Sequence, residues 1–309
     1  MRVYKNTDVV SINKPVATIG MFDGVHQGHK EILSLLKKKA DEINGETVVI
    51  SFWPHPRMIF EGNNSLRLLT TMDEKVYLLN KEQIKHFVIL PFNRDFANIP
   101  YQEFVSDILV NKLKIHTLIV GYNHQFGKNR EGNFDRLKDL SKKFNFNVQK
   151  LDPHLVNQEK VSSSIIRESL EIGNIDQAND YLGYDFNFTG FVVEGKRKGR
   201  GIGFPTANLF IREPYKLIPG TGVYAVKVKL AGEIYQGMMN IGYRPTIVED
   251  NKQKSIEVNI FNINKDLYGK ELTIFVLEKT RDEIKFGTIQ ELITQLHKDE
   301  EIIKKILNK

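Results

Sequence analysis

The feature that most constrains this chain is the segment 20–29, Gly-Met-Phe-Asp-Gly-Val-His-Gln-Gly-His, which holds three glycines and two histidines within ten residues. An apolar run, 16–19, precedes it, and apolar residues at helical spacing follow over 32–43. This order predicts a strand, a glycine-rich turn and a helix whose N-terminal amides face a ligand above the sheet. His26 and His29 add donors suited to phosphate oxygens. A turn with two surface histidines is the plainer alternative, and the rest of the chain weighs against it.

Strand-like and helix-like runs alternate through the first half of the chain. Strands are predicted at 16–20, 47–53, 87–90, 117–121 and 147–151. Helices are predicted at 30–44, 73–86, 101–114 and 134–144. This alternation predicts an α/β domain with a Rossmann-like parallel sheet covered on both faces. Ligands of such sheets bind beyond the carboxyl ends of the strands, where the strand order reverses.

Two more turns after predicted strands hold residues suited to a nucleotide or an aromatic ligand. The second strand leads into Pro54-His55-Pro56, and the fourth leads into 121–130, which contains Asn123 and Phe126. Because the carboxyl ends of parallel strands meet at one edge, these turns and the histidine turn are expected to share a crevice. Their convergence is a stronger indication of a binding site than any one motif.

A serine run, Ser162-Ser163-Ser164, precedes the next apolar helical pattern. Serines in this position cap helices, which is the ordinary interpretation. Arg167 lies one turn into that helix and can reach a phosphate at the helix N-terminus. The two interpretations are compatible.

The pattern changes after Gly183. Short β-branched runs replace the helical periodicity, at 186–193, 222–230, 233–240, 255–262 and 271–277. They predict an antiparallel β-barrel, followed by a terminal helix over 288–307. The predicted domains are therefore 1–183 and 184–309.

The second half has its own dense motif at 199–209. Gly199, Gly201 and Gly203 alternate and exclude a central strand, so they predict a flexible flap. Thr206 and Asn208 follow and offer oxygens to a hard cation, although a glycine-rich barrel turn would use the same residues. Further along, Glu257 interrupts the apolar run 256–261, so its carboxylate lies on a solvated strand face or in a pocket.

Composition limits the classes of partner. The net charge of +6 is modest and spread over both halves, so no nucleic-acid partner is expected. The chain has no cysteine, which excludes disulfides and thiolate chemistry. No signal-peptide core or membrane-spanning run is present in the sequence, so a cytoplasmic protein without a membrane partner is expected.

The first half resembles the nucleotidyltransferases with a His-x-Gly-His signature and, among them, the FMN adenylyltransferase module of bacterial FAD synthetases. The resemblance rests on 20–29, Pro54-His55-Pro56, 121–127 and the serine run with Arg167. The second half resembles the riboflavin kinase module, through 199–209, 219–224, Glu257 and 267–269. This chain departs from the family pattern at Ser164, usually threonine, at His124, often phenylalanine, and at Asn259, commonly histidine.

The resemblance implies a bifunctional enzyme with riboflavin, FMN, FAD and ATP as its small-molecule partners. It would phosphorylate riboflavin to FMN and then adenylylate FMN to FAD, releasing pyrophosphate. The riboflavin hydroxyl must lose a proton, so Glu257 is assigned as the base. Thr206 and Asn208 would hold Mg²⁺, and Gly199, Gly201 and Gly203 would bind ATP. Arg281 would contact the flavin or its new phosphate.

The FMN phosphate is already ionised, so the adenylyl step needs positioning and charge stabilisation rather than a base. Catalytic roles are assigned to His26, His29 and Arg167. ATP and its phosphates would contact Gly20, Phe22, Gly28, Asn123, Ser162 and Ser163, and the flavin site would be lined by Pro54, Pro56, Phe60 and Phe126. A flavin-binding or regulatory protein with one active module is the alternative, and a relative of the class I aminoacyl-tRNA synthetases ranks lower.

Overall fold

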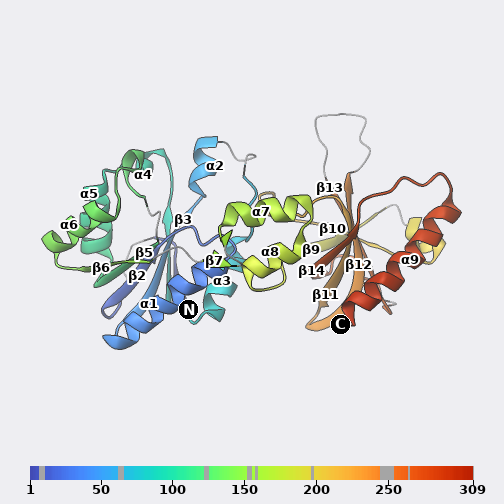
Figure 1. Cartoon of the computed structure of the whole chain (residues 1–309), viewed down its shortest axis with the longest axis horizontal. Helices are drawn as coiled ribbons and strands as arrows, with labels where there is room; N and C mark the ends of the chain where they lie inside the picture. The colour runs from blue at the N-terminus through green and yellow to red at the C-terminus, as the bar shows by residue number, and fades with distance from the viewer. Residues whose placement is uncertain are drawn as a thin grey trace. The chain divides into compact units, whose positions relative to one another are not determined.

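The computed structural model describes residues 1–6, 11–61, 66–121, 125–151, 155–156, 159–195, 198–243, 254–263 and 265–308. The chain forms two compact units, 1–163 and 164–309 (Figure 1). The predicted functional boundary after Gly183 lies 20 residues beyond this structural division, and it stays a prediction.

The first unit is built on a six-stranded sheet in which every neighbouring pair is parallel, with the order β1-β4-β3-β2-β5-β6. The order reverses about β2, so the crevice expected of such a sheet lies at the carboxyl ends of β2 and β5. The five predicted strands are confirmed, and the short edge strand β1 is additional. The strands are β1 (Arg2–Tyr4), β2 (Pro15–Ile19), β3 (Glu46–Trp53), β4 (His86–Pro91), β5 (Thr117–Gly121) and β6 (Asn147–Leu151).

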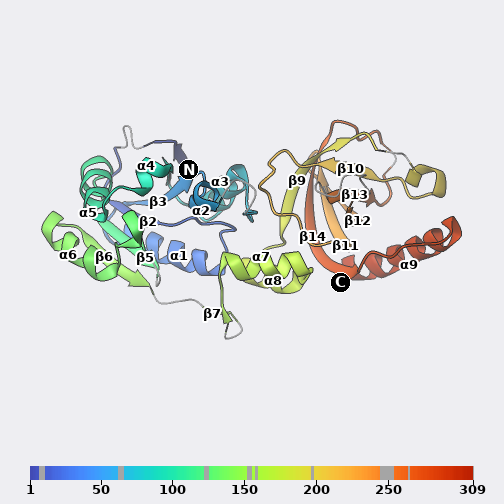
Figure 2. The same cartoon turned by 90° about the horizontal axis from the view of Figure 1, so that it is seen from above.

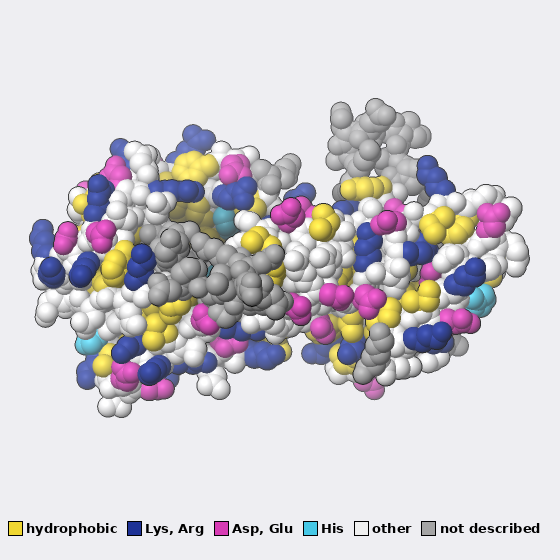
Figure 3. Space-filling view, in the orientation of Figure 1, with side chains coloured by type: hydrophobic (Ala, Val, Ile, Leu, Met, Phe, Trp, Pro, Cys, Tyr) yellow, Lys and Arg dark blue, Asp and Glu magenta, His cyan; other side chains and the backbone are white. Residues whose placement is uncertain are grey.

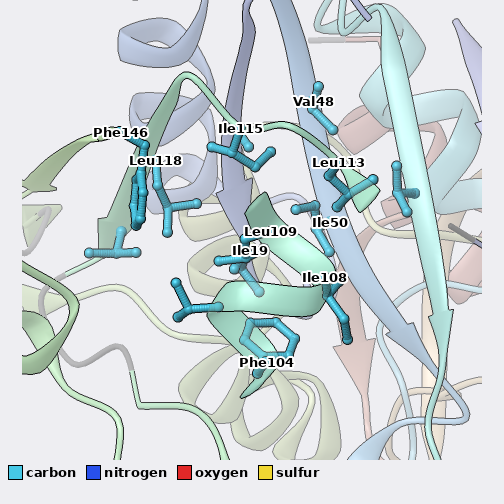
Figure 4. Packing of buried hydrophobic residues seen from close by; sticks show 14 of the residues in the cluster. Ile19, Val48, Ile50, Phe104, Ile108, Leu109, Leu113, Ile115, Leu118 and Phe146 are labelled. Atoms are coloured by element: carbon cyan, nitrogen blue, oxygen red, sulfur yellow. The ribbon is translucent and has the colours of Figure 1, made fainter. Parts of the chain in front are cut away.

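Helices cover both faces of this sheet, as predicted (Figures 1 and 2). Alternate strand residues point to opposite faces. Val16 and Val49 pack with α1 (Gln27–Glu42) and α3 (Met72–Lys81). Ala17, Val48 and Ile50 pack with the helices of the other layer, and Figure 4 shows this cluster. The helices of that layer include the π-helix η1 (Phe104–Lys112) and α6 (Phe134–Phe144).

The helix predicted over 101–114 is present with a different hydrogen-bond pattern. It begins as α5 (Tyr101–Glu103) and continues as η1, in which Leu113 N–H donates to the Ile108 carbonyl five residues earlier. The helix predicted over 73–86 ends at Lys81. The remaining elements of the unit are α2 (Pro56–Glu61), α4 (Arg94–Ala97), the 3-10 turn η2 (Lys128–Arg130) and the hairpin of β7 (Leu155–Val156) and β8 (Glu159–Lys160).

The second unit is a closed antiparallel barrel, preceded by two helices and followed by one. The strand order is β10-β13-β12-β11-β14-β9, and the pairing of β9 with β10 closes the barrel. This confirms the predicted barrel and terminal helix. The elements are α7 (Ser163–Ile172), α8 (Ile175–Leu182), β9 (Asn187–Val193), η3 (Lys198–Ile202), β10 (Ala207–Phe210), β11 (Gly222–Leu230), β12 (Glu233–Tyr243), β13 (Lys254–Ile260), β14 (Glu271–Arg281) and α9 (Ile289–Leu307).

Part of the 199–209 motif is a central strand, contrary to prediction. The glycines lie in η3 and the turn after it, but β10 begins at Ala207 and is paired on both sides, with β9 and β13. The segment after Pro205 has no glycine and no further proline, so nothing prevents it from joining a ladder.

No helix in the described part of the chain combines the length and apolarity needed to cross a membrane. On the face drawn in Figure 3, Lys and Arg side chains are interspersed with Asp and Glu, so the formal charge of +6 is not concentrated there.

Two candidate active sites

The glycine-rich turn joins β2 to α1, as predicted. Phe22, Gly24 and Val25 have positive φ angles of 48°, 83° and 38°, so the backbone turns through the left-handed region three times. For Phe22 and Val25 this conformation is unfavourable and must be imposed by the surroundings. Gly20 lies just after β2 and Gly28 lies in the first turn of α1.

The two histidines of the turn stack on each other. His26 is the N-cap of α1, and its Nδ1 accepts a hydrogen bond of 3.4 Å from the His29 backbone N–H. The ring centroids lie 3.7 Å apart with 18° between the ring planes, and the Phe22 ring lies 4.7 Å from that of His29. The sequence-predicted residues Phe22, His26 and His29 therefore form one cluster at the end of β2.

His29 is held in its neutral form. Burial, together with His26 and Lys75, keeps the pKa of the His29 imidazole well below its ordinary value of 6.5. Its Nδ1 is buried without a hydrogen-bond partner in the described part of the chain. Near neutral pH His29 can therefore donate one N–H to a ligand but does not bring a full positive charge.

The side chain of Asp23, within the turn, and those of Thr70 and Lys75, outside it, fix the turn, and none of the three was assigned a role from the sequence. Asp23 is 1% exposed, and its oxygens accept from Leu69 N–H (3.1 Å), Thr70 N–H (3.0 Å) and the Thr70 hydroxyl (3.1 Å). The Met21 carbonyl accepts from Lys75 Nζ at 2.7 Å. An aspartate among the glycines was a possible signal. Lys75 gave a weaker one, since it shares the helix face of buried Leu79, four residues on.

The serine run adjoins the same turn. The Ser163 hydroxyl donates to the Asp23 carbonyl at 3.0 Å, at the start of α7, and Ser162 lies half-buried just before it. Arg167 is half-buried on α7 within the second unit. Asn123 lies outside the described residues, so its predicted role is carried forward as a prediction.

The predicted flavin-lining phenylalanines belong to one aromatic cluster. Phe60 is 62% exposed and contacts Phe92, with ring centroids 6.2 Å apart. Phe126 contacts Phe104 at 5.7 Å between centroids, and Phe96 links the two pairs at 5.7 and 6.1 Å. The prolines lie where β3 leads into α2: Pro54 follows a cis peptide bond after Trp53, and Pro56 is the first residue of α2.

The second unit brings Thr206, Asn208 and Glu257 together. The Thr206 hydroxyl donates to Glu257 Oε2 at 3.3 Å. Asn208 is the direct register partner of Glu257 across β10 and β13, and Asn240 is its partner across β13 and β12. Residues directly opposite in antiparallel strands point to the same face. The half-buried Glu257 carboxylate is therefore flanked by two carboxamides and a hydroxyl.

Asn259 contacts Pro205, the residue directly before Thr206. It is 7% exposed, and its Nδ2 donates to the Pro205 carbonyl at 2.7 Å. Because Asn259 and Glu257 lie two residues apart on β13, their side chains share a face and hold Pro205 and Thr206 at consecutive positions. This is the position where the resembled family commonly has histidine.

The structure requires glycine at some positions of the 199–203 flap and not at others. A Cβ at Gly199 would collide with the Phe204 carbonyl oxygen, and Gly203 has a φ of 86°. A Cβ at Gly201 would meet no atom within 4 Å in the described structure. Gly195, which was not identified from the sequence, permits another close approach: a Cβ there would collide with the Asn208 carboxamide.

Arg281 is bound to the terminal helix. Its Nε donates to Asp299 Oδ1 at 2.9 Å and one terminal nitrogen donates to Oδ2 at 2.6 Å. Its other terminal nitrogen donates to the Asp282 carbonyl at 2.9 Å. The predicted contact between Arg281 and the flavin stays a prediction.

A separate cavity of about 370 Å³ lies at the opposite edge of the first unit's sheet. Its lining includes Glu46 and His86, the first residues of β3 and β4. It is therefore distinct from the carboxyl end of β2, where Phe22, His26 and His29 form a cluster.

Family models match both halves of the chain. A model described as FAD synthetase matches residues 10–165, and one described as riboflavin kinase matches residues 182–307. Between these matches lie α7, after its first three residues, and most of α8.

Curated relatives match nearly the whole chain. Proteins named bifunctional riboflavin kinase/FMN adenylyltransferase are 38% identical in Haemophilus influenzae, over 94% of both chains, and 35% identical in Escherichia coli K12, over 92% of this chain and 90% of the relative. A crystal structure described as a macrolide-efflux protein from Streptococcus pneumoniae superposes with a TM-score of 0.89, at 30% identity over 98% of each chain.

Proposed function

The chain belongs to the family of bifunctional riboflavin kinases/FMN adenylyltransferases, and on this premise we propose that it converts riboflavin to FMN and then FMN to FAD, using ATP in both steps. The observation that carries the proposal is the presence of both family matches, FAD synthetase and riboflavin kinase, in one chain. The two clusters of site residues support it, because each suits one of the two reactions.

The kinase step is assigned to the barrel. The Glu257 carboxylate would accept the proton of the riboflavin hydroxyl as that oxygen attacks the γ-phosphorus of ATP. Thr206 and Asn208 fit a Mg²⁺ site, because they offer neutral oxygens beside a carboxylate and leave most of the coordination to phosphate and water. When bound, Mg²⁺ would neutralise charge on the transferred phosphate. Gly199, Gly201 and Gly203 would let the backbone approach ATP, and Arg281 is proposed to contact the flavin.

The adenylyl step is assigned to the histidine turn. An FMN phosphate oxygen would attack the α-phosphorus of ATP, and the bond to pyrophosphate would break. No base is needed, so the turn must align two anions and donate hydrogen bonds to the developing charge. The stacked pair of His26 and His29 supports this role, since a neutral His29 is a donor at neutral pH.

The remaining residues of the first site are proposed in supporting roles. Arg167 would stabilise the leaving pyrophosphate. The ATP phosphates would be bound by Gly20, Phe22, Gly28, Asn123, Ser162 and Ser163. The exposed edge of the aromatic cluster suits an isoalloxazine ring, so this ring would lie against Pro54, Pro56, Phe60 and Phe126.

One experiment tests both assignments. The full chain is incubated with ATP and Mg²⁺ and either riboflavin or FMN, and the flavins are separated by chromatography. We expect Glu257→Gln to abolish FMN formation while FAD formation from supplied FMN continues. His29→Ala should show the reverse pattern, with adenylylation lowered by on the order of 10²–10³-fold.

Each variant serves as the folding control for the other. A wild-type chain that binds flavins but makes only one product, or none, would favour the alternative of a flavin-binding or regulatory protein. Normal FMN formation by Glu257→Gln would remove that residue from the mechanism.

A further inference from the structure

A buried lysine lies beneath the histidine turn. Lys75 is 2% exposed, on α3, and its Nζ donates to the Met21 carbonyl at 2.7 Å. The Ser51 hydroxyl of β3 donates to the same carbonyl oxygen at 3.3 Å. Two donors from separate elements thus fix the peptide group from which the turn starts.

Burying this amine is costly. Burial lowers the pKa of Lys75, and the Asp23 carboxylate partly offsets that fall. An apolar side chain of similar length would pack at this position without removing an ammonium group from water. The contact with Met21 therefore points to a function that an apolar residue could not provide.

That function lies in the turn itself. Directly after Met21, Phe22 takes a φ of 48° and places its ring 4.7 Å from that of His29. Val25 takes a φ of 38° next to His26, the N-cap of α1. A non-glycine residue stays in this region only where neighbouring groups over-determine its conformation. Lys75 is one of those groups, at the point where the strained segment begins.

We propose that Lys75 is a positioning residue for adenylylation: its ammonium group holds the Met21 carbonyl so that the strained turn presents His26 and His29 to the ATP phosphates. The buried positive charge of Lys75 also acts on His29, where it favours the neutral imidazole. This rests on the proposed function of the turn. The charged and titratable groups acting on this cluster are His26, Lys75 and, on Lys75, Asp23.

The test compares Lys75→Met with Lys81→Met in the full chain. Methionine keeps the length of the side chain but removes the donor and the charge. Lys81 is an exposed lysine at the end of the same helix, so its variant is the matched control. A displacement of about 1 Å at a reacting group can cost on the order of 10²-fold. We therefore expect Lys75→Met to lower kcat/KM for FAD formation from FMN at least about 10-fold. FMN formation from riboflavin should stay within about twofold in both variants, because the barrel belongs to the other compact unit of the chain.

A second measurement separates a positioning role from a loss of packing. Removing the charge of Lys75 should raise the pKa of His29, which nuclear magnetic resonance of the imidazole protons reports directly. Chemical rescue adds a third readout. Because the chain has no cysteine, Lys75→Cys can be alkylated selectively with bromoethylamine in the unfolded state and refolded. The resulting aminoethyl thioether restores the amine, and we expect it to restore adenylylation.

The outcomes are distinct. A wild-type chain that makes no FAD from FMN overturns the proposed function and this proposal with it. A wild-type chain that makes FAD, with Lys75→Met within about threefold of it, overturns the Lys75 proposal alone. If Lys75→Met loses both activities through misfolding, the alkylated protein decides: recovery of FMN formation without FAD formation overturns the proposal, as does an unchanged pKa of His29.

Discussion

The ion pair between Arg281 and Asp299 gives the most direct test of how the barrel holds its terminal helix. Asp299 is 1% exposed and accepts from Arg281 on both oxygens, and Gln295 donates to Oδ1 at 2.8 Å. Asp299→Ala would leave the guanidinium without its partner while most of its surface stays buried. Removing one member of a buried pair costs roughly 3–5 kcal/mol. Because 17% of the Arg281 side chain is exposed and can recruit water, we expect the lower end, about 3 kcal/mol.

Scanning calorimetry of the full chain measures this effect. For a domain of about 150 residues, each kcal/mol lowers Tm by roughly 2–4 °C, so the transition of the second unit should fall by about 6–12 °C. The matched control is Lys304→Ala, which removes a partly exposed pair with Glu300 on the same helix, in which 44% of the Lys304 side chain and 26% of the Glu300 side chain are exposed. That pair should contribute less than about 1 kcal/mol.

The double variant Arg281→Met with Asp299→Leu tests whether the loss of stability comes from the unpaired charge. It removes both charges, so no unpaired group remains and it should be more stable than Asp299→Ala. The reasoning is refuted if Asp299→Ala unfolds within about 2 °C of Lys304→Ala, or if the double variant is less stable than the single one.

Two further predictions follow from the site geometry. The first concerns pH. The folded state keeps the pKa of His29 below its ordinary value of 6.5. Between the folded-state pKa and 6.5 the unfolded state therefore binds more protons than the folded state. The unfolding free energy should therefore fall as pH drops below about 6.5, and His29→Gln should remove this part of the slope in denaturant titrations at several pH values. The second concerns Asn259: Asn259→Leu leaves the Pro205 carbonyl unpaired, at a cost of about 1–3 kcal/mol, and should weaken FMN formation through Thr206. Asn259→His restores a donor and should retain activity, while FAD formation from supplied FMN reports folding. Equal rates for the leucine and histidine variants would contradict it.

The fold was predictable because its main elements carry local periodic signals. The strand from Pro15 to Ile19 is wholly buried, and α1 buries Leu33, Leu36 and Ala40 at helical spacing. The edge strand β1 was missed because it has only three residues, of which Val3 is 40% exposed. The π-helical bonding of η1 was missed because apolar spacing does not report which carbonyl each N–H selects.

The candidate sites were predictable only where residue type and chemistry coincide. Two histidines among glycines, or a glutamate in an apolar strand, are visible in the sequence. Lys75 is only weakly visible, through its spacing of four residues from Leu79, since a lysine on an amphipathic helix is normally at the solvated face. The same holds for Asp299, whose partner Arg281 lies 18 residues earlier on another element. In both residues the burial of a charge depends on a tertiary contact that no local pattern contains.

The two sites treat a carboxylate in opposite ways, which fits the chemistry proposed for each. Asp23 lies within the turn assigned to two anionic substrates, where a free negative charge would repel both. Its oxygens instead accept hydrogen bonds from Leu69 and Thr70. The positive charge of Lys75 offsets the negative charge of the Asp23 carboxylate, so little negative potential is left for the ligand. Glu257 accepts one hydrogen bond, from Thr206, within the described part of the chain, and it is only half-buried. It therefore keeps lone pairs for a proton, which an alcohol nucleophile must release and a phosphate nucleophile need not.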